Sequence, residues 1–340
     1  MIPKQTVNMT DVARRSGVSI ASVSRALRGE AGVSPATRDR ILAVARELSY
    51  VVSPEASRLS GGPTGRVAVI VPRVDAWFYS TILAGIADEF DAIGLDLVLC
   101  TLTGSSARHR FFEALPLRRK VDAVVVVSLP LSARERTRLE QLAVPTVFVG
   151  GHRVENHPWV GIDDERAARQ AVGHLLHIGH RDIAMIQAAD DTDIPWATDQ
   201  ARIRGFHRQL QEAGLTDPTV VNVKWSIVGG SRGMEMLLSR SRLPTAVFCH
   251  SDEIALGALR TLRRSGIAVP QQISIIGVDD HPSADISDLT TVAQPVRRQG
   301  RLAARAVLDR LSGGDAAEPV VSVDILATRL VIRGTTAPPR

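Results

Sequence analysis

Short apolar segments alternate with amphipathic helical segments from about residue 64 to residue 334 of this 340-residue chain. Strands that are apolar throughout are typical of parallel sheets covered by helices on both faces. The predicted strands are Val67–Val71, Leu95–Cys100, Ala123–Val127, Thr146–Val149, Ile183–Ile186, Val220–Val223, Ala246–Cys249 and Ile273–Val278, with helices near residues 78–93, 132–142, 165–178, 200–213, 231–239 and 252–265. So many strands suit two doubly wound lobes better than one. Ligands of such lobes bind at the carboxyl ends of the strands, in the crevice between the lobes.

The first 60 residues have a different pattern, in which two short helices are joined by a turn that contains glycine. Asn8 suits the N-cap of a first helix, which Gly17 ends, and Ser19 suits the N-cap of a second helix that runs to about Arg28. Ser34, followed by proline, begins a third helix whose apolar side closes a small core. The pattern predicts an all-α helix-turn-helix domain.

This head also carries most of the net charge of the protein. The whole chain is +5 at pH 7, and residues 1–60 hold +4 of that charge. The outer face of the second helix presents small hydroxyls, apolar tips and cations, namely Ile20, Ala21, Ser24, Arg25 and Arg28. Such a face can approach DNA closely, donate to phosphates and bases, and contact a thymine methyl group. We therefore expect the head to bind double-stranded DNA, with phosphate neutralisation supplying much of the affinity.

Composition and missing motifs limit the other classes of function. Two cysteines, Cys100 and Cys249, are too few for a disulfide framework or a cysteine zinc site. No segment approaches the roughly 20 apolar residues that cross a bilayer, and the start of the chain lacks a secretory signal. The sequence contains neither G-x-G-x-x-G nor a P-loop. We expect a cytoplasmic protein that needs no cofactor and does not bind membranes.

One motif leaves an enzyme open as an alternative. Residues 229–233 match the G-x-S-x-G elbow of serine hydrolases, with Ser231 as nucleophile and Asp279 and His281 later in the chain. Against a hydrolase, Ser231 suits an N-cap, and no glycine-rich oxyanion motif follows an earlier strand. We expect no catalytic residue.

Two further alternatives carry less weight. His174, His177 and His180 are spaced like metal ligands, but the last two flank Gly179 and no carboxylate pattern accompanies them, so no metal is expected. A solute-binding protein would share the fold of the body, but it would have a signal peptide and no DNA-binding head.

The head resembles the lactose-repressor (LacI/GalR) family. The matching runs are Asp11-Val12-Ala13, Gly17-Val18-Ser19, Val23-Ser24-Arg25-Ala26-Leu27, Val33-Ser34, Thr37-Arg38 and Leu48-Ser49-Tyr50. The resemblance implies that the second helix lies in the major groove and that Ile20, Ala21 and Arg25 read base edges. It implies contacts to the DNA backbone from Ser19, Ser22, Ser24, Ser34, Thr37 and Tyr50. Arg28 stands where the family usually has asparagine, and we expect its longer cation to add a phosphate or base contact.

The segment that follows the head is predicted to be a hinge. Residues 51–65 end in a Gly/Pro-rich run, and Ser53, followed by proline, begins a helix that is too short to be stable alone in water. The resemblance implies that two such helices, one from each subunit, pair in the minor groove. Leu59 would then wedge open the central base step, and Ala56 would be the small residue where the helices meet. The chain departs from the family in having Val51, Val52 and Ser53 in place of Arg-Pro-Asn.

The body resembles the effector domain of the same family, which has the type I periplasmic-binding-protein-like fold. The matching pieces are Val67–Pro72, Trp77-Phe78, Gly179-His180-Arg181, Arg202, Gly205-Phe206, Asp252, Leu256–Leu259, Val269-Pro270, Ile275–Asp280, Leu289–Val292 and Gln294-Pro295. The resemblance implies three crossings between lobes, near Asp163, Thr291 and Val323. The expected domains are a head at 1–52, a hinge at 53–63, an effector-binding and dimerisation domain at 64–334 and a tail at 335–340. Within the body, lobe 1 is about 64–163 plus 291–322, and lobe 2 is 164–290 plus 323–334.

The same resemblance supplies the candidate effector-binding residues, which are Trp77, Phe78, Trp196, Arg202, Ser251 and Asp279. Arg202 is expected to grip effector oxygens, because arginine suits paired acceptors, and Asp279 to accept from ligand hydroxyls. The aromatic faces of Trp77 and Phe78 would stack on a sugar ring, and Trp196 would form part of the pocket lid. Ser251 and Gly151 stand where many relatives have asparagine and aspartate, so hydroxyl contacts are fewer and a typical hexose is disfavoured.

These observations predict a DNA-binding transcriptional regulator, a repressor, whose operator affinity is controlled by a small-molecule effector bound between the lobes. The effector is expected to be a sugar or a related polar metabolite. The operator is expected to be pseudo-palindromic, because two heads of a homodimer bind its half-sites. After the end of the body near Arg333 only Gly334–Arg340 remain, without an appended heptad helix of the kind that makes four-stranded assemblies, so a dimer is expected instead of a tetramer. DNA and effector affinities are then linked by about 1–3 kcal/mol.

The hinge assignment can be tested by Leu59→Ala. We expect weaker operator binding in an electrophoretic mobility shift, because the wedge that kinks the duplex is removed, and unchanged ligand binding by calorimetry. An equal loss of ligand affinity would contradict the wedge role.

Overall fold

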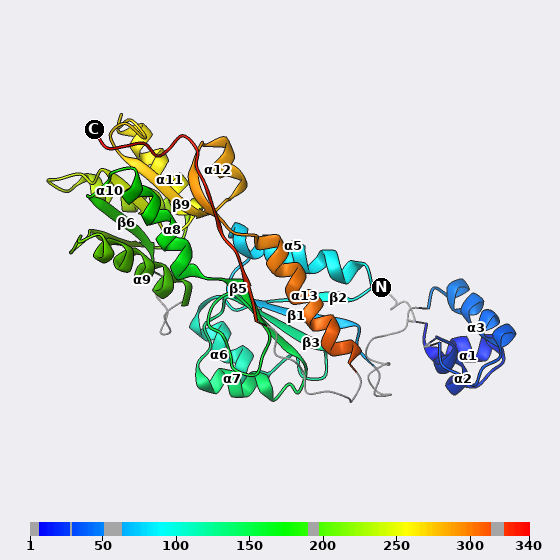
Figure 1. Ribbon diagram of the computed structural model, residues 1–340. Coiled ribbons are helices and arrows are strands. Elements are labelled where there is room, and N and C mark those ends of the chain that lie inside the picture. Colours follow the sequence, from blue (N-terminus) through cyan, green and yellow to red (C-terminus); the bar gives the residue numbers. More distant parts are fainter. Residues whose placement is uncertain (1–6, 28, 51–62, 190–196, 314–322) are drawn as a thin grey trace. The chain divides into compact units, whose positions relative to one another are not determined.

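The computed structural model describes residues 7–27, 29–50, 63–189, 197–313 and 323–340 (Figure 1). The chain separates into two compact units, Met1–Gly65 and Arg66–Arg340. The predicted hinge helix, with Ala56 and Leu59, lies outside the described residues, as do Arg28 and Trp196. Among the described helices, none has the length and apolar character needed to span a membrane.

The head is a three-helix domain, as its pattern of caps predicts. Its helices are α1 (Met9–Ser16), α2 (Ile20–Leu27) and α3 (Pro35–Glu47). Asn8 caps α1 in a reciprocal capping box with Asp11, and Gly17 ends the helix in the left-handed region at φ 67°. Val12, Val23 and Ile41, one from each helix, are fully buried and form the centre of the core.

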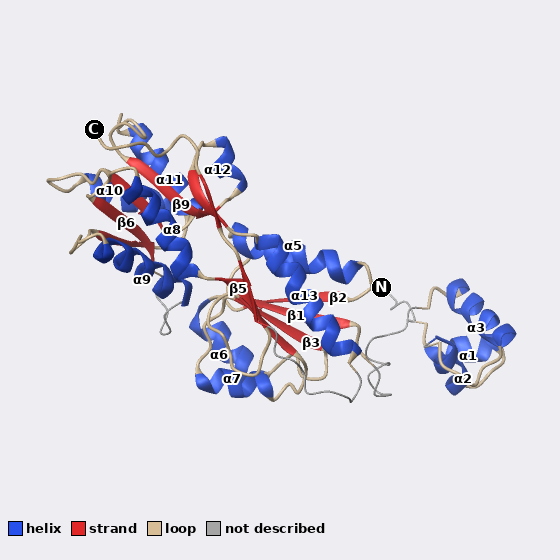
Figure 2. Ribbon diagram, in the orientation of Figure 1, coloured by secondary structure: helices blue, strands red, loops and turns tan. Residues whose placement is uncertain are grey.

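Lobe 1 of the body is a six-stranded parallel sheet between two pairs of helices (Figure 2). The strand order is β11-β5-β4-β3-β1-β2. The strands are β1 (Arg66–Val71), β2 (Asp96–Thr101), β3 (Ala123–Val127), β4 (Thr146–Val149), β5 (Trp159–Ile162) and β11 (Val323–Leu326). Helices α5 (Trp77–Asp91) and α13 (Val296–Ser312) cover one face, and α6 (Gly104–Ala114) and α7 (Ala133–Glu140) cover the other. Both faces of β1 and β3 are therefore apolar.

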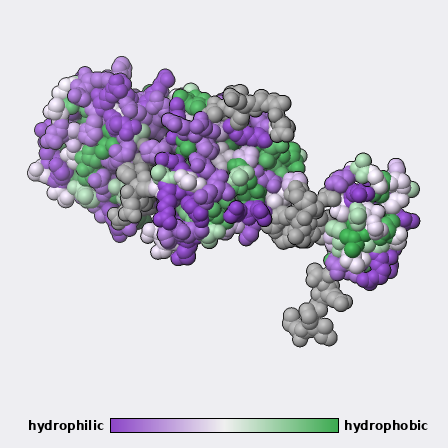
Figure 3. Space-filling view, turned by 90° about the horizontal axis from the view of Figure 1, so that it is seen from below, coloured by the Kyte–Doolittle hydropathy of each residue, from purple (hydrophilic) through white to green (hydrophobic). Residues whose placement is uncertain are grey.

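Lobe 2 repeats this architecture with the order β12-β10-β9-β8-β6-β7. Its strands are β6 (Ile183–Ala188), β7 (Val220–Val223), β8 (Ala246–Cys249), β9 (Ser274–Asp279), β10 (Thr290–Ala293) and the antiparallel edge strand β12 (Arg329–Val331). Its helices are α8 (Asp164–His177), α9 (Ala197–Glu212), α10 (Ile227–Leu238), α11 (Asp252–Arg264) and α12 (Pro282–Ile286). Two doubly wound lobes are thus confirmed. On the face visible in Figure 3, hydrophilic residues form most of the surface of the body.

Strands β5, β10, β11 and β12 were not among the predicted strands, because they lack a long apolar run. Strands β11 and β12 lie at sheet edges and have no buried residue, and β10 is Thr-Thr-Val-Ala. Because of the pairing of β10 and β11, two of the three crossings between the lobes lie slightly later in the chain than expected. Strand β10 pairs with β9 in lobe 2, so the second crossing follows Ala293 and not Thr291. Strand β11 pairs with β5 in lobe 1, so the third crossing follows Leu326 and not Val323.

The tail expected at residues 335–340 is packed against lobe 2. Thr335 is buried, its amide oxygen accepts from Ile275 N at 2.8 Å, and its hydroxyl accepts from Thr290 N at 2.9 Å. This segment satisfies polar groups at the amino ends of β9 and β10, which explains why it belongs to the body.

Helix α10 begins four residues before the predicted helix at 231–239. Its N-cap is Ser226, whose hydroxyl accepts from Gly229 N at 2.9 Å, so the expected capping role of Ser231 is wrong. The pair Gly229-Gly230 disfavours a helix by propensity. It is tolerated because α10 packs closely on α11: a Cβ at Gly230 would lie 2.0 Å from Ile254 O.

Helices α5 and α13 of lobe 1 approach each other in the same way. A Cβ at Gly85 would lie 2.1 Å from Arg297 O, and one at Gly300 would lie 2.3 Å from Ile82 O. These backbone atoms cannot move without separating the two helices, so a side chain at either glycine must widen the contact.

We expect Gly85→Ala to lower the free energy of unfolding by about 1–3 kcal/mol, the usual cost of overpacking a core. The matched control is Gly173→Ala in α8, where a new Cβ would meet only Gln209 Cδ at 3.9 Å. The control should be neutral or slightly stabilising, because alanine is the better helix former. Equal effects in urea unfolding would contradict close packing at Gly85.

Candidate DNA-binding face and effector cleft

Helix α2 turns its small and basic residues away from the core of the head. Val23 and Ala26 are buried, whereas Ile20, Ala21 and Arg25 are exposed. Ile20 is 48% exposed. The three residues predicted to read bases therefore share one exposed surface, which we call the recognition face.

The residues predicted to contact the DNA backbone lie mainly at helix N-termini. Ser19 Oγ accepts from Ser22 N at 3.1 Å at the start of α2. Ser34 Oγ accepts from Thr37 N at 3.3 Å at the start of α3. Helix N-termini present unpaired N–H groups and a positive dipole end, which suits phosphate oxygens. Tyr50 is half-buried against the core, and burial raises the pKa of its phenol.

The body contains a small cavity of about 30 Å³ where the two lobes meet, room for about one water molecule. Lobe 1 contributes Phe78, Tyr79, Ser128, Gly150 and Gln299, and lobe 2 contributes Asp164, Thr198, Asp199, Arg202, Trp225 and Asp279, with Ile162 and Gln294 at the crossings. These residues follow the carboxyl ends of strands or begin helices, as expected for a ligand crevice in this architecture.

The guanidinium of Arg202 lies at the centre of this cavity wall and is almost fully buried. Its Nε donates to Asp164 Oδ1 at 2.9 Å and its Nη1 donates to His250 O at 2.5 Å. Its Nη2 lies 3.6 Å from Asp279 Oδ1. Burial lowers the pKa of Arg202, but Asp164 and Asp279 raise it by more, so the cation is held in place. It presents a fixed positive charge to ligand oxygens.

Asp279 connects this cation to lobe 1. Gln294 Nε2 donates to Asp279 Oδ1 at 2.6 Å, and Gln299 Nε2, from α13, donates to Gln294 Oε1 at 2.9 Å. Burial raises the pKa of Asp279 to about 8, against the opposing effect of Arg202. Asp279 also has φ 130°, a conformation that non-glycine residues rarely adopt and that is common at ligand sites.

Two further contacts join the lobes outside the cavity. Arg73 Nη1 of lobe 1 donates to Trp225 O of lobe 2 at 3.2 Å. The rings of Trp77 and His281 lie 5.2 Å apart across the same boundary. Trp225 is further fixed by donating from Nε1 to Glu253 Oε2 at 2.9 Å.

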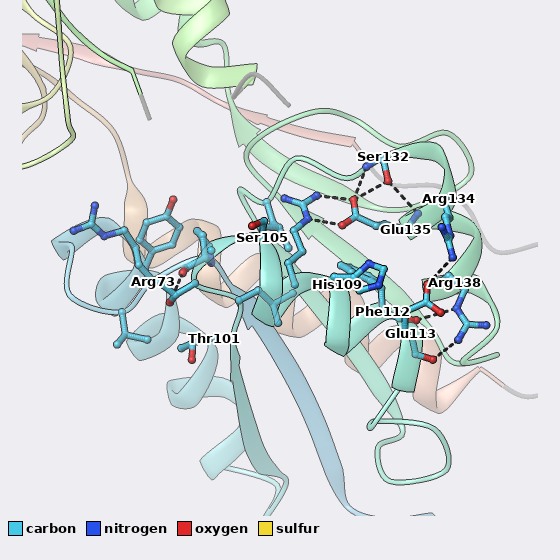
Figure 4. A pocket seen from close by; sticks show the side chains of 18 of the residues that line it. Arg73, Thr101, Ser105, His109, Phe112, Glu113, Ser132, Arg134, Glu135 and Arg138 are labelled. Carbon is cyan, nitrogen blue, oxygen red and sulfur yellow. Dashed lines mark hydrogen bonds and ion pairs between the residues drawn. The ribbon is translucent and has the colours of Figure 1, made fainter. Parts of the chain in front are cut away.

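Figure 4 shows a much larger groove, of about 1130 Å³. Tyr79 and Trp225 line both this groove and the cavity. The far wall of the groove is formed by α6 and α7, which carry several arginines. Arg108 Nη2 donates to Glu135 Oε2 at 2.6 Å, and Arg134 pairs with Glu113 at 2.6 Å. Arg138 Nη2 donates to the carbonyl of Glu113 at 2.6 Å. These cations already have partners, so the groove wall is a structural network.

The structure brings together only some of the predicted effector residues. Phe78, Arg202 and Asp279 line the cavity. Trp77 does not line it and packs against His281, and Ser251 is fully buried as the N-cap of α11, accepting from Ile254 N at 3.4 Å. These two residues therefore have structural roles in this arrangement of the lobes.

Several cavity residues were missed by sequence reasoning. Asp164, Asp199, Gln294 and Gln299 have no distinctive motif, and Asp164 follows the strand β5 that was itself missed. Trp225 could have been predicted as a cavity residue, because it follows a predicted strand in a chain with only 4% aromatic residues.

The alternative motifs have ordinary structural roles. Ser231 lies inside α10, is buried, and donates from Oγ to Gly257 O at 3.0 Å. His281 Nδ1 accepts from Ser283 N at 2.9 Å as the N-cap of α12. His180 lies within 2.9 Å of Thr245 Oγ1 and of Ala337 O, through different ring nitrogens. Neither a nucleophile elbow nor a histidine cluster is formed by these residues.

A helix-turn-helix head on a two-lobed, binding-protein-like body defines a class of ligand-responsive DNA-binding regulators. Family comparison agrees: residues 8–53 match the model of bacterial regulatory proteins of the lacI family, and residues 172–336 match a periplasmic binding protein-like domain. The chain is similar to the HTH-type transcriptional repressor CytR of Escherichia coli K12, with 32% identity over 96% of each chain. The chain belongs to the LacI family, whose members are transcription regulators and not enzymes.

Solved structures support the same assignment over nearly the full length. The structure of the lac repressor dimer bound to operator and the anti-inducer ONPF has a TM-score of 0.83 at 28% identity and covers 98% of this chain and 100% of that one. A complex of the regulator CelR with cellobiose has a TM-score of 0.70 at 31% identity and covers 97% and 99%.

The buried carboxylates predict a pH dependence of stability. An aspartate has a pKa of about 4 when unfolded, so the raised pKa values of Asp279, about 8, and Asp252, about 6, mean that the folded state binds more protons between pH 4 and 8. Their contribution to the free energy of unfolding therefore falls as pH rises through this window. Asp279→Asn should flatten the slope between pH 6 and 8 in chemical unfolding. The control Asp217→Asn, on an exposed turn, should not, and an unchanged slope in Asp279→Asn would contradict the assignment.

Proposed function

We propose that this protein is a homodimeric repressor that binds a pseudo-palindromic operator and whose operator affinity is set by a small, sugar-like molecule held between the lobes. The observation that carries the proposal is the presence, in one chain, of an exposed recognition face on the head and a buried arginine–carboxylate cleft in the body. The recognition face suits contacts to the base edges of DNA, and the cleft suits a hydroxyl-rich ligand.

The DNA-binding part of the proposal depends on the recognition face. Ile20 and Ala21 offer apolar contacts to thymine methyl groups, and Arg25 offers a bidentate donor to a guanine. Ser19, Ser22, Ser24, Ser34, Thr37 and Tyr50 are proposed to position the head by backbone contacts, with Arg28, Ala56 and Leu59 adding contacts from segments that the structure does not describe. Support comes from the lac repressor relative, which was solved as a dimer on its operator.

The effector part depends on the cleft between the lobes. Arg202 and Asp279 offer a fixed donor and a fixed acceptor on one wall, and Phe78 and Trp225 offer apolar faces that suit a sugar ring. Relatives were solved with ONPF and with cellobiose. Because the cavity holds only about 30 Å³, a sugar enters it only if the lobes or the lining side chains rearrange. A ligand that prefers one arrangement shifts the equilibrium toward it, which is the physical basis of control.

The proposed site of action is the cytoplasm, where operator DNA lies. The proposed dimer is supported by the lac repressor relative, which was solved as a dimer bound to operator, and each head would then read one half-site.

The proposal is tested by Arg25→Ala. DNA duplexes from the genomic region next to the gene for this protein are mixed with the full chain, and their binding is followed by fluorescence anisotropy. We expect operator affinity to fall by about 1–3 kcal/mol and discrimination to relax at one base pair of each half-site. The control Arg14→Ala removes an exposed cation of α1, outside the recognition face, and should leave the base preference unchanged. Equal binding of Arg25→Ala and wild type would refute the recognition face.

A further inference from the structure

Unpartnered polar atoms gather at one place in lobe 2. Within the described residues, the buried side-chain nitrogen and oxygen atoms without a hydrogen-bond partner are Arg38 Nε, Gln187 Oε1, Asp199 Oδ1, His250 Nδ1 and His250 Nε2. All except Arg38 Nε belong to three residues at the carboxyl edge of the sheet. A buried polar atom without a partner is destabilising, so a group of them requires an explanation.

The three residues are brought together by neighbouring elements. Ile186 of β6 pairs with Cys249 of β8, so Gln187 and His250, one residue further along, hold corresponding positions on adjacent strands. They point to the same face as Met185 and Phe248, which α8 and α9 cover. Asp199 lies in the first turn of α9, and its Oδ1 faces His250 Nε2 at 3.1 Å.

Only Asp199 of these three residues lines the cavity between the lobes. It is 7% exposed, whereas His250 is fully buried behind it, against the ring of Trp225 at 5.1 Å. An occupant of the cavity therefore meets the carboxylate of Asp199 first, and His250 reaches the occupant only through that carboxylate.

The charges around the cavity are unbalanced in favour of acceptors. Asp164, Asp199 and Asp279 all act on the single guanidinium of Arg202. Burial raises the pKa of Asp164 and of Asp279, against the opposing effect of Arg202. Gln187 Oε1 adds another acceptor without a donor. An anion placed there would face three aspartates that share one guanidinium, whereas a hydroxyl or N–H group would donate a hydrogen bond to them.

We propose that Asp199 is a contact residue for the effector, and that it selects an uncharged or cationic ligand with hydroxyl or N–H donors and excludes phosphorylated and carboxylated metabolites. This inference depends on the proposed function of the cleft as the effector site. His250 is a positioning residue, which holds the Asp199 carboxylate toward the cavity.

The test uses the full chain and small-molecule fractions of a cell extract, sorted by ion exchange into anionic, neutral and cationic pools. Thermal unfolding is followed while each pool is titrated, and the bound compound is identified by mass spectrometry. We expect the neutral or cationic pool to raise the Tm. Asp199→Asn should require at least about tenfold more of that pool, because a hydrogen bond to a charged group is lost. The control Glu212→Gln removes a carboxylate from the far end of α9, where it pairs with Arg169, and should respond like wild type.

The positioning role of His250 has its own readout. His250→Gln keeps a donor near the position of Nε2, whereas His250→Leu does not, so the glutamine variant should retain most of the ligand response and the leucine variant should lose it. If His250 had only a structural role, the ligand response of each variant would instead follow the Tm of that variant without ligand.

Three results would overturn the inference. Stabilisation by the anionic pool, or by no pool, contradicts the selection of donor-bearing ligands. An Asp199→Asn response equal to wild type means that Asp199 does not contact the ligand. Operator binding by the ligand-free variants separates these failures from failure of the proposed function, because it does not depend on Asp199.

Discussion

The buried guanidinium of Arg202 is the interaction on which the ligand cleft depends. A buried cation is tolerated only when carboxylates and carbonyls surround it closely, since desolvation otherwise costs several kcal/mol. Its partners begin α8, follow β8 and end β9, so one side chain fixes three segments at the carboxyl edge of lobe 2. The same geometry makes three aspartates, Asp164, Asp199 and Asp279, share this one guanidinium. Arg202 therefore holds the site together, and the aspartates around it are proposed to select the ligand.

The connection from this cation to lobe 1 explains how occupancy of the cleft can move whole lobes. Asp279 accepts from Gln294, which accepts from Gln299 on α13. Helix α13 is packed without space against α5 through Gly85 and Gly300, so the two helices respond as one body. Since closely packed elements do not deform continuously, a change at the cleft is expressed as a shift between discrete arrangements. Regulation then requires only that a ligand stabilise one arrangement more than the other.

Much of the fold could be predicted because its signals are local. Asn8, Gly17 and Ser34 set the helix boundaries of the head, and uninterrupted apolar runs set the inner strands of both sheets. The edge strands β11 and β12 could not be predicted, because their place is decided by pairing with distant segments and not by their own residues. The cleft was predicted in part for the same reason. Arg202 and Asp279 matched a family pattern, whereas the importance of Asp199 follows from its place on the cavity wall beside buried His250, which only three-dimensional packing reveals.

The central claim is that ligand occupancy of the cleft controls the affinity of the head for DNA. The most direct measurement is an in vitro selection of genomic duplexes by the full chain, performed with and without the small-molecule extract of the same cells. The account predicts one enriched pseudo-palindromic sequence whose recovery changes when the extract is present. Enrichment of no sequence, or recovery of the same sequence in equal amounts under both conditions, would contradict it.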